Sequence, residues 1–407
     1  MTDHQKILAL ADQCVKCGMC QTVCPTYRLQ HHEAESPRGR IALIQGLLEN
    51  RLDAAPGLIR HLDNCLQCRA CEALCPSRVA YGRLINYAMA HLPPAAAGNF
   101  RVQTFFRIFN RLLDSNMVPA LLQSMLWLAR KTRLQYLGWR PGALDRHSLG
   151  GNISITQEPN PTQAALRDRE KTPVNLFTGC MSDLLQQNTV TAAIRVLSHL
   201  GFQSVLPASR QCCGALHLRQ GEPERSQLLQ QRLRQSIDTG LPMVSLVSAC
   251  SAQLREHAAV DAEEFSSFVN QHWRDHLQLR ALPRTILVHE ACSLRNGLRE
   301  QRDLYQLLAR IPEARIQALA DNAMCCGAGG SYMLSHPREA HILAAEKVQA
   351  IMDTENAVVV STNLGCALHL SNGLHQRGCR TPVLHPAQLL AELLSPNPVL
   401  SNNKARS

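Results

Sequence analysis

The chain has 407 residues, a formal net charge of +10 and a hydrophobic content of 45%, with aromatic residues at only 4%. This length predicts roughly two to three domains, and the apolar content excludes a disordered chain. No apolar run approaches the ~18 residues of a membrane-spanning helix, and the N-terminus lacks a secretory signal pattern, so we expect a cytoplasmic protein. In that reducing compartment, the 17 cysteines predict metal binding or redox chemistry instead of disulfides.

The first eight cysteines form two copies of the pattern C-x2-C-x2-C-x3-C-P. Three cysteines at this spacing typically bind one [4Fe-4S] cluster, while the fourth binds the other cluster of the pair. The predicted ligands of the first cluster are Cys14, Cys17, Cys20 and Cys75, and those of the second are Cys65, Cys68, Cys71 and Cys24. The alternative is two zinc sites, but zinc ribbons usually bring two separated cysteine pairs.

The stretch between the two motifs has a helical pattern. In PRGRIALIQGLLEN, the apolar residues Ile41, Ile44, Leu47 and Leu48 recur at helical spacing. We therefore predict an α-helical ferredoxin domain over residues 1–95, unlike compact bacterial ferredoxins, which place short strands there. Arg38 and Arg40 either neutralise the charge of a cluster or are ordinary solvated arginines, and the sequence leaves both interpretations open.

A basic segment follows this domain. Residues 101–150 contain eight Lys or Arg against two Asp, and residues 100–139 interleave arginines with large apolar residues at helical spacing. We predict a basic amphipathic helical linker over residues 96–170. It either lies on an anionic membrane surface or packs as a helical hairpin on protein. No DNA-reading motif is present, so we expect no nucleic-acid partner.

The C-terminal half contains an internal repeat. The first copy has Cys180, Cys212, Cys213 and Cys250, and the second has Cys292, Cys325, Cys326 and Cys366, at offsets of 112, 113, 113 and 116 residues. Apolar runs alternate with helical patterns, such as those near residues 188–200 and 337–352. This predicts two tandem α/β units over residues 171–283 and 284–395, with largely parallel sheets and cysteines past the strand ends. The predicted fold class is therefore a multidomain α+β protein.

Each unit gathers four thiols around a vicinal Cys-Cys-Gly. Vicinal cysteines seldom form a disulfide, but they can offer two thiolates to a metal from one turn. These eight cysteines are candidate metal ligands; the alternative is that they are buried thiols acting as small hydrophobic residues. Cys379 has no counterpart and is read as structural. The glycine-rich segment 325–331 lacks the context of a dinucleotide fingerprint.

Three segments resemble the iron–sulfur subunits of glycolate dehydrogenases, also called glycolate oxidases. They are CVKCGMCQTVCPTY (14–27), SPRGRIALIQGLLE (36–49) and HLDNCLQCRACEALCPSRVAYGRLI (61–85), and the resemblance extends over nearly the whole chain. The architecture is shared with the iron–sulfur subunits of D-lactate and anaerobic glycerol-3-phosphate dehydrogenases and with heterodisulfide reductases. The resemblance implies a subunit with no catalytic residue of its own.

On this resemblance, FAD-binding partner subunits would oxidise glycolate to glyoxylate, and this chain would relay the electrons toward a quinone or another membrane acceptor. It would sit in the cytoplasm or at the cytoplasmic face of the inner membrane. In heterodisulfide reductase relatives, each cysteine-rich unit ends in CxxC and five cysteines hold a noncubane cluster. Here Gln253 and His369 stand at the last position, so the metal content of both units stays open, with His369 either a ligand or a plain helix histidine.

Overall fold

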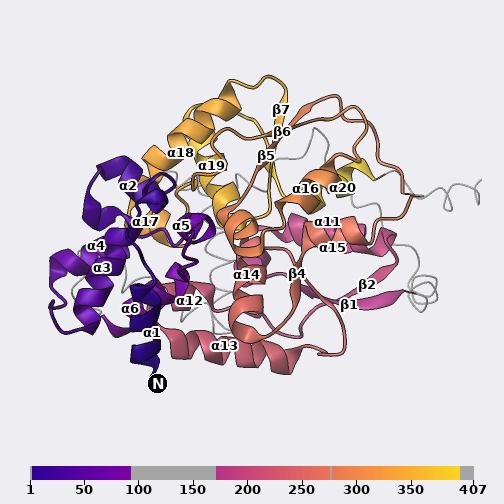
Figure 1. Cartoon of the computed structure of the whole chain (residues 1–407). Coiled ribbons are helices and arrows are strands. Elements are labelled where there is room, and N and C mark those ends of the chain that lie inside the picture. Colours follow the sequence, from indigo (N-terminus) through magenta and orange to yellow (C-terminus); the bar gives the residue numbers. More distant parts are fainter. Residues whose placement is uncertain (1, 93–170, 276, 395–407) are drawn as a thin grey trace, which may run out of the picture.

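The computed structural model describes residues 2–92, 171–275 and 277–394. Figure 1 shows the N-terminal helices, in indigo, lying against one side of two α/β units in magenta and orange-yellow. The predicted linker at 96–170 lies outside the described residues. In the described part of the chain, no helix is long and apolar enough to cross a membrane.

Helices alone build the N-terminal part, because residues 2–92 contain no strand. They are α1 (Asp3–Asp12), α2 (Pro25–Gln30), α3 (Pro37–Leu48), α4 (Pro56–Asp63), α5 (Ala70–Leu74) and α6 (Tyr81–His91), with the 3-10 turns η1 (Met19–Gln21) and η2 (Glu33–Glu35). The predicted helix corresponds to α3. It begins after Ser36, whose Oγ accepts a hydrogen bond from the Gly39 amide, and proline occupies its first position. Ile41 and Ile44 then point into the core, which Leu84 and Ile85 of α6 complete.

The first α/β unit contains a four-stranded parallel sheet in the order β2-β1-β3-β4. Its strands are β1 (Thr172–Phe177), β2 (Phe202–Val205), β3 (Met243–Ser245) and β4 (Ala262–Glu264). Its helices are α10 (Ser182–Leu185), α11 (Gln187–His199), α12 (Ala215–Arg219), α13 (Pro223–Ser236), α14 (Ser248–Gln253) and α15 (Phe265–Gln271), with the π-type turn η6 (Leu254–Ala258). The central strands β1 and β3 are buried, as parallel strands covered by helices require.

The second unit has the same strand arrangement, with a parallel sheet in the order β6-β5-β7-β8. Its strands are β5 (Thr285–His289), β6 (Arg315–Ala318), β7 (Ala357–Ser361) and β8 (Val383–Leu384). Its helices are α16 (Gln301–Leu308), α17 (Tyr332–Ser335), α18 (Pro337–Met352), α19 (Leu364–Gln376) and α20 (Pro386–Leu393), with the π-type turn η7 (Ser293–Leu298). In both units, the single cysteines follow the ends of the two central strands, where sites of open α/β sheets lie.

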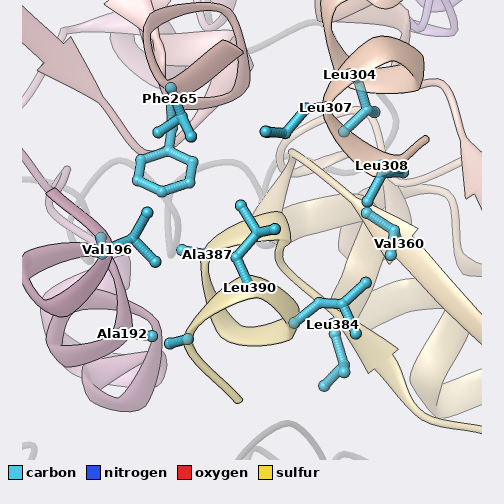
Figure 2. Close-up of a cluster of buried hydrophobic side chains, with 14 of the residues drawn as sticks. Ala192, Val196, Phe265, Leu304, Leu307, Leu308, Val360, Leu384, Ala387 and Leu390 are labelled. Carbon is cyan, nitrogen blue, oxygen red and sulfur yellow. The ribbon is translucent and has the colours of Figure 1, made fainter. Parts of the chain in front are cut away.

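One hydrophobic core joins the two units. Figure 2 shows Val196 of α11 and Phe265 of α15, from the first unit, facing Leu390 of α20, from the second. Leu308 of α16 and Val360 of β7 continue the same cluster, and all five side chains are buried. Each buried side chain of this size contributes about 1.5–3 kcal/mol relative to exposure. The shared core therefore fixes the cysteine-bearing loops of both units relative to each other.

Candidate metal centres

The four cysteines predicted for the first cluster come together near the surface. They line one cavity, whose cysteines are Cys14, Cys17, Cys20, Cys71 and Cys75. Cys17 is exposed, whereas Cys14, Cys20 and Cys75 are half-buried. Gly18 in this loop has φ +85°, a conformation that favours glycine and lets the chain turn between Cys17 and Cys20.

The four cysteines predicted for the second cluster line a second, more buried cavity. They are Cys24, Cys65, Cys68 and Cys71. The fourth cysteine of each motif thus lies with the first three cysteines of the other motif. Cys71 lines both cavities, so the two sites are adjacent. The first cavity has five thiols on its wall and the second has four. Four thiols are the donor set that a [4Fe-4S] cluster takes, so these residues fit two such clusters.

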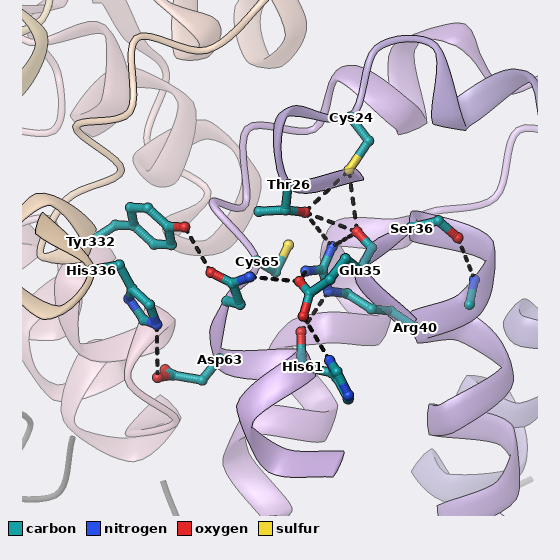
Figure 3. A network of polar contacts seen from close by, with 12 residues as sticks. Cys24, Thr26, Glu35, Ser36, Arg40, His61, Asp63, Cys65, Tyr332 and His336 are labelled. Carbon is teal, nitrogen blue, oxygen red and sulfur yellow. Dashed lines mark hydrogen bonds and ion pairs between the residues drawn. The ribbon is translucent and has the colours of Figure 1, made fainter. Parts of the chain in front are cut away.

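A buried polar network stands beside the second cavity (Figure 3). The Arg40 side chain is 1% exposed and lines this cavity; its Nη2 donates to Glu35 Oε2 at 2.5 Å, and its Nε donates to the His61 carbonyl at 2.7 Å. Glu35 also accepts from Asn64 Nδ2 at 2.6 Å. Burial opposes the charge of Arg40, but the acidic groups around it, Cys65 first among them, raise its pKa above the ordinary value. Arg40 therefore carries a fixed positive charge next to the second set of thiols.

Arg38 occupies a different setting. Its side chain is partly exposed, lines the first cavity, and pairs with Glu33 at 2.7 Å while donating to the Lys16 carbonyl at 3.1 Å. Both arginines thus lie beside a cysteine cavity, but only Arg40 is withdrawn from solvent. Tyr81, which we did not single out from the sequence, lines both cavities and donates from its hydroxyl to Cys65 Sγ at 3.4 Å.

The cysteines of the first α/β unit lie in apolar surroundings. Cys213 Sγ is 3.2 Å from Cys250 Sγ, and both pack in a cluster with Phe177 and Leu233. Hydrogen bonds with Cys212 and Cys250 raise the pKa of Cys213 well above its ordinary value. Cys180 comes directly after Gly179, where an added Cβ would lie 3.6 Å from Cys250 Sγ. The structure therefore gathers these cysteines at one sheet edge.

The cysteines of the second unit also pack in hydrophobic clusters, but a buried histidine lies beside them. Hydrogen bonds from Cys292 and Cys326 lower the pKa of Cys325 well below its ordinary value, and Cys326 also contacts Cys366. The ligand atoms of Cys326, Cys366 and His289 all lie within 4.8 Å of one another. All three residues are buried, and His289 is the last residue of β5. Burial lowers the pKa of His289 to about 3, so its imidazole is neutral, which is the form that binds metals.

The histidine beside these sulfurs is His289, and of the two interpretations left open for His369 the structure fits a plain helix histidine. His369 Nε2 lies 3.0 Å from the Ala340 carbonyl, so this ring is held by the backbone of α18. A signal for His289 exists in the sequence, because it stands three residues before Cys292 in the repeated apolar run. Cys379 lies 3.3 Å from Thr381 Oγ1 and packs in the cluster around α19, apart from these ligand atoms.

A cavity of about 220 Å³ lies where the N-terminal part meets both α/β units. Its wall includes four cysteines, namely Cys68, Cys292, Cys325 and Cys366. Asn296 Nδ2 donates to the Cys68 carbonyl at 2.9 Å, which ties the second cysteine motif to the second unit. Gly329 and Gly330 of the glycine-rich segment also line it, both with positive φ, so this segment shapes a cavity beside the cysteines.

Similarity to known proteins agrees with this arrangement. Residues 10–79 match the 4Fe-4S dicluster domain family, and residues 174–255 and 286–371 match the cysteine-rich domain family. The chain is 28% identical to the probable glycolate oxidase iron–sulfur subunit of Bacillus subtilis (strain 168), over 93% of each chain. It is 27% identical to the glycolate oxidase iron–sulfur subunit of Escherichia coli (strain K12), over 94% of this chain and 93% of the relative.

A shorter relative matches only part of the chain. Lactate utilization protein A of Bacillus velezensis (strain DSM 23117 / BGSC 10A6 / LMG 26770 / FZB42) is 24% identical over 53% of this chain and 98% of its own length. The match to the two glycolate oxidase subunits instead covers nearly all of both chains. The chain is thus a homologue of glycolate oxidase iron–sulfur subunits, built from a 4Fe-4S dicluster domain and two cysteine-rich domains.

Proposed function

We propose that this chain is the electron-transfer subunit of a glycolate dehydrogenase complex. It receives electrons from FAD-binding subunits that oxidise glycolate to glyoxylate and passes them toward a quinone or another membrane acceptor. The observation that carries the proposal is the division of eight cysteines between two adjacent cavities, each with thiols from both motifs. Iron–sulfur clusters, when bound there, supply one-electron carriers.

The surface around the first cavity favours it as the side that meets the flavin-bearing partner. Val15 is 69% exposed and Met19 47% exposed, and Leu74 beside Cys75 is also exposed. Large apolar side chains gathered on a surface mark a protein contact. A partner covering them would stand next to the exposed Cys17. The first set of cysteines therefore lies nearest to the proposed electron donor.

The second set of cysteines lies deeper and contacts the second cysteine-rich unit. Burial and the neighbouring Cys325 raise the pKa of Cys68, and both cysteines line the same 220 Å³ cavity. Arg219 of the first unit donates to the carbonyls of Cys65 and Leu66 at 2.8 and 2.7 Å, which holds this loop in place. The proposed direction of electron flow therefore runs from the surface set through the buried set toward the cavity, where a small acceptor has room to bind.

Domain organisation is part of the same proposal. We propose a ferredoxin domain over residues 1–95, a linker over 96–170 and cysteine-rich domains over 171–283 and 284–395. The linker is the proposed contact with the membrane surface at its cytoplasmic face. Carbonate-wash fractionation of the assembled complex tests this contact. If the complex stays wholly soluble without detergent or salt, the linker serves protein packing instead.

Crossed cysteine variants test the ligand sets directly. We expect Cys75→Ser to remove the cluster of the first motif and Cys24→Ser to remove that of the second. Anaerobic iron and acid-labile sulfide analysis, with EPR of the dithionite-reduced chain, measures both losses. Cys379→Ser is the matched control and should change neither signal. If Cys75→Ser instead removes the cluster bound by Cys65 and Cys68, or if the chain binds only zinc, the proposed ligand sets are wrong.

The substrate of the partner is tested on the natively purified complex. We expect a flavoprotein to co-purify and glycolate to bleach the absorbance of the complex anaerobically. The alternative substrate is D-lactate, which the similarity to a protein named for lactate utilisation supports. Bleaching by D-lactate and not by glycolate would replace the glycolate assignment while leaving the electron-transfer role intact.

A further inference from the structure

The two cysteine-rich units differ at the positions that surround their cysteines. The last residue of β1 is Phe177, whereas the last residue of the equivalent strand β5 is His289. Each stands three residues before the first cysteine of its unit. Phe177 is 1% exposed and His289 2% exposed, so the same buried place holds a benzyl group in one unit and an imidazole in the other.

A second difference lies on the long helix of each unit. Leu233 of α13 and Lys347 of α18 both stand ten residues after the proline that begins their helix. Both side chains are buried, with Leu233 0% and Lys347 2% exposed. Lys347 Nζ donates to the Asp321 carbonyl at 2.7 Å, and its electrostatic neighbours include Cys325, Cys326 and Cys366. An ammonium group thus replaces an apolar side chain beside the thiols of the second unit.

We propose that the second cysteine-rich unit binds an iron–sulfur centre in which His289 is a ligand together with the cysteines of that unit. Cys326 and Cys366 are the nearest sulfur ligands, and Cys292 and Cys325 complete the donor set. An imidazole is a known replacement for thiolate on iron.

The hydrogen bonding of His289 suits a metal ligand. Its Nδ1 lies 3.1 Å from Ser361 Oγ, the residue paired with it across β5 and β7. A metal-bound histidine usually hydrogen-bonds through its other ring nitrogen, which fixes the orientation of the ring. Nε2 is therefore the nitrogen left for the metal. In the first unit, the corresponding Ser245 bonds within its own loop, to the Val247 carbonyl at 3.3 Å.

Lys347 supplies the charge that such a centre requires. Several thiolates buried together carry negative charge, and a buried charge is tolerated only when it is paired. Lysine has three donor hydrogens, and the Ala320 and Asp321 carbonyls lie 3.4 and 2.7 Å from its nitrogen. Lys347 therefore places a buried amino group near the thiols of the second unit, where the first unit has the apolar Leu233.

The position of this centre connects it to the electron path. Cys292, Cys325 and Cys366 line the cavity that Cys68 also lines. A centre bound by these thiols would therefore lie next to the second ferredoxin-type set and face the open cavity. Imidazole ligation raises the reduction potential of an iron–sulfur centre relative to all-thiolate ligation. The centre would thus be the downstream electron acceptor within the chain.

The test uses the full chain loaded anaerobically with iron and sulfide and labelled with ¹⁵N-histidine. We expect the reduced protein to show a histidine nitrogen coupling by pulsed EPR and to hold more iron than its two N-terminal sites account for. His289→Phe, which installs the side chain of the first unit, should lose both the coupling and the additional iron. His369→Gln is the matched control and should keep both.

Two further variants separate ligation from folding. His289→Cys restores a donor, so it should keep the additional iron, lose the nitrogen coupling and shift the reduction potential of this centre downward. Lys347→Leu should weaken metal binding by about 10- to 100-fold, as loss of an outer-shell contact does. The EPR signals of the N-terminal clusters report that each variant is folded.

Three results would overturn the proposal. They are a nitrogen coupling that persists in both His289 variants, an iron content that the N-terminal sites fully explain, and stoichiometric zinc in the second unit. None of these readouts depends on glycolate or on the partner subunits. Failure of this proposal is therefore distinguishable from failure of the proposed electron-transfer function.

Discussion

Replacing Arg40 with methionine isolates the energetic role of the buried network beside the second set of thiols. The Arg40 guanidinium makes four hydrogen bonds, to the His61 carbonyl, Thr26 Oγ1, the Glu35 carbonyl and Glu35 Oε2, at 2.7, 3.0, 2.6 and 2.5 Å. Methionine fills most of the space of the arginine side chain but donates no hydrogen bond. The Glu35 carboxylate, 3% exposed, would then keep only its contacts with Asn64 and His61.

The expected cost is about 3–5 kcal/mol, because removing one partner leaves an uncompensated buried charge. Arg38→Met is the matched control on the same helix. Its partner Glu33 has a side chain that is 52% exposed, so loss of this solvent-screened pair should cost far less than loss of the buried one. The double variant Arg40→Met, Glu35→Gln should recover part of the loss, since it removes the unpaired carboxylate as well.

Hydrogen exchange by mass spectrometry on the metal-loaded chain measures these effects as changes in the free energy of opening of α3. We expect exchange from α3 to accelerate by at least about a hundredfold in Arg40→Met, since 1.4 kcal/mol corresponds to a factor of ten. Arg38→Met should change it by less than about tenfold. Equal acceleration in the two variants would show that burial of the Arg40–Glu35 pair does not govern the stability of this region.

Three further predictions follow from individual contacts. Tyr81→Phe removes the hydroxyl that donates a hydrogen bond to Cys65 Sγ at 3.4 Å. We expect the reduction potential of the second cluster, measured by anaerobic redox titration, to fall by roughly 20–60 mV, the equivalent of about 0.5–1.5 kcal/mol. Burial raises the pKa of Glu264 from 4.5 to about 8, so the folded chain keeps a proton that the unfolded chain loses between those values. The free energy of unfolding should therefore fall as pH rises from 4.5 to 8, and Glu264→Gln should flatten this fall in denaturant titrations; an unchanged slope would exclude the effect. Gly221 has φ +76°, and an added Cβ would lie 2.2 Å from the Met89 carbonyl oxygen. Gly221→Ala should therefore loosen the contact between α6 and the first unit, which limited proteolysis would detect as faster cleavage at α6. Gly378→Ala is the control: no atom lies within 4 Å of its added Cβ, so this variant should not affect α6.

Much of the architecture is readable from local patterns. The helix over residues 37–48 follows from apolar spacing behind a Ser-Pro start, and the second long helix occupies residues 337–352 as its pattern indicates. These elements are encoded locally, because a helix needs only one apolar face and suitable ends. The cysteine motifs are likewise local, since the first three cysteines of each motif lie within seven residues of chain.

The histidine beside the sulfurs of the second α/β unit was not predicted from the sequence. His369 stands at the expected interval after Cys366, yet the helical turn directs it to the Ala340 carbonyl. His289 reaches the sulfurs because it ends the buried central strand β5, and the cysteines that come after β5, β6 and β7 meet at one edge of this parallel sheet. Sequence intervals alone do not reveal which side chains share that edge.

The linear order of residues thus determined the thiol-rich loops, their repetition and the local helices, because these depend on neighbours along the chain. Tertiary packing alone decided that Arg40 is buried against Glu35, that His289 and Lys347 stand among the thiols of one unit, and that Cys68 shares a cavity with that unit. These features depend on groups separated by up to several hundred residues, which only the close-packed core brings within contact distance.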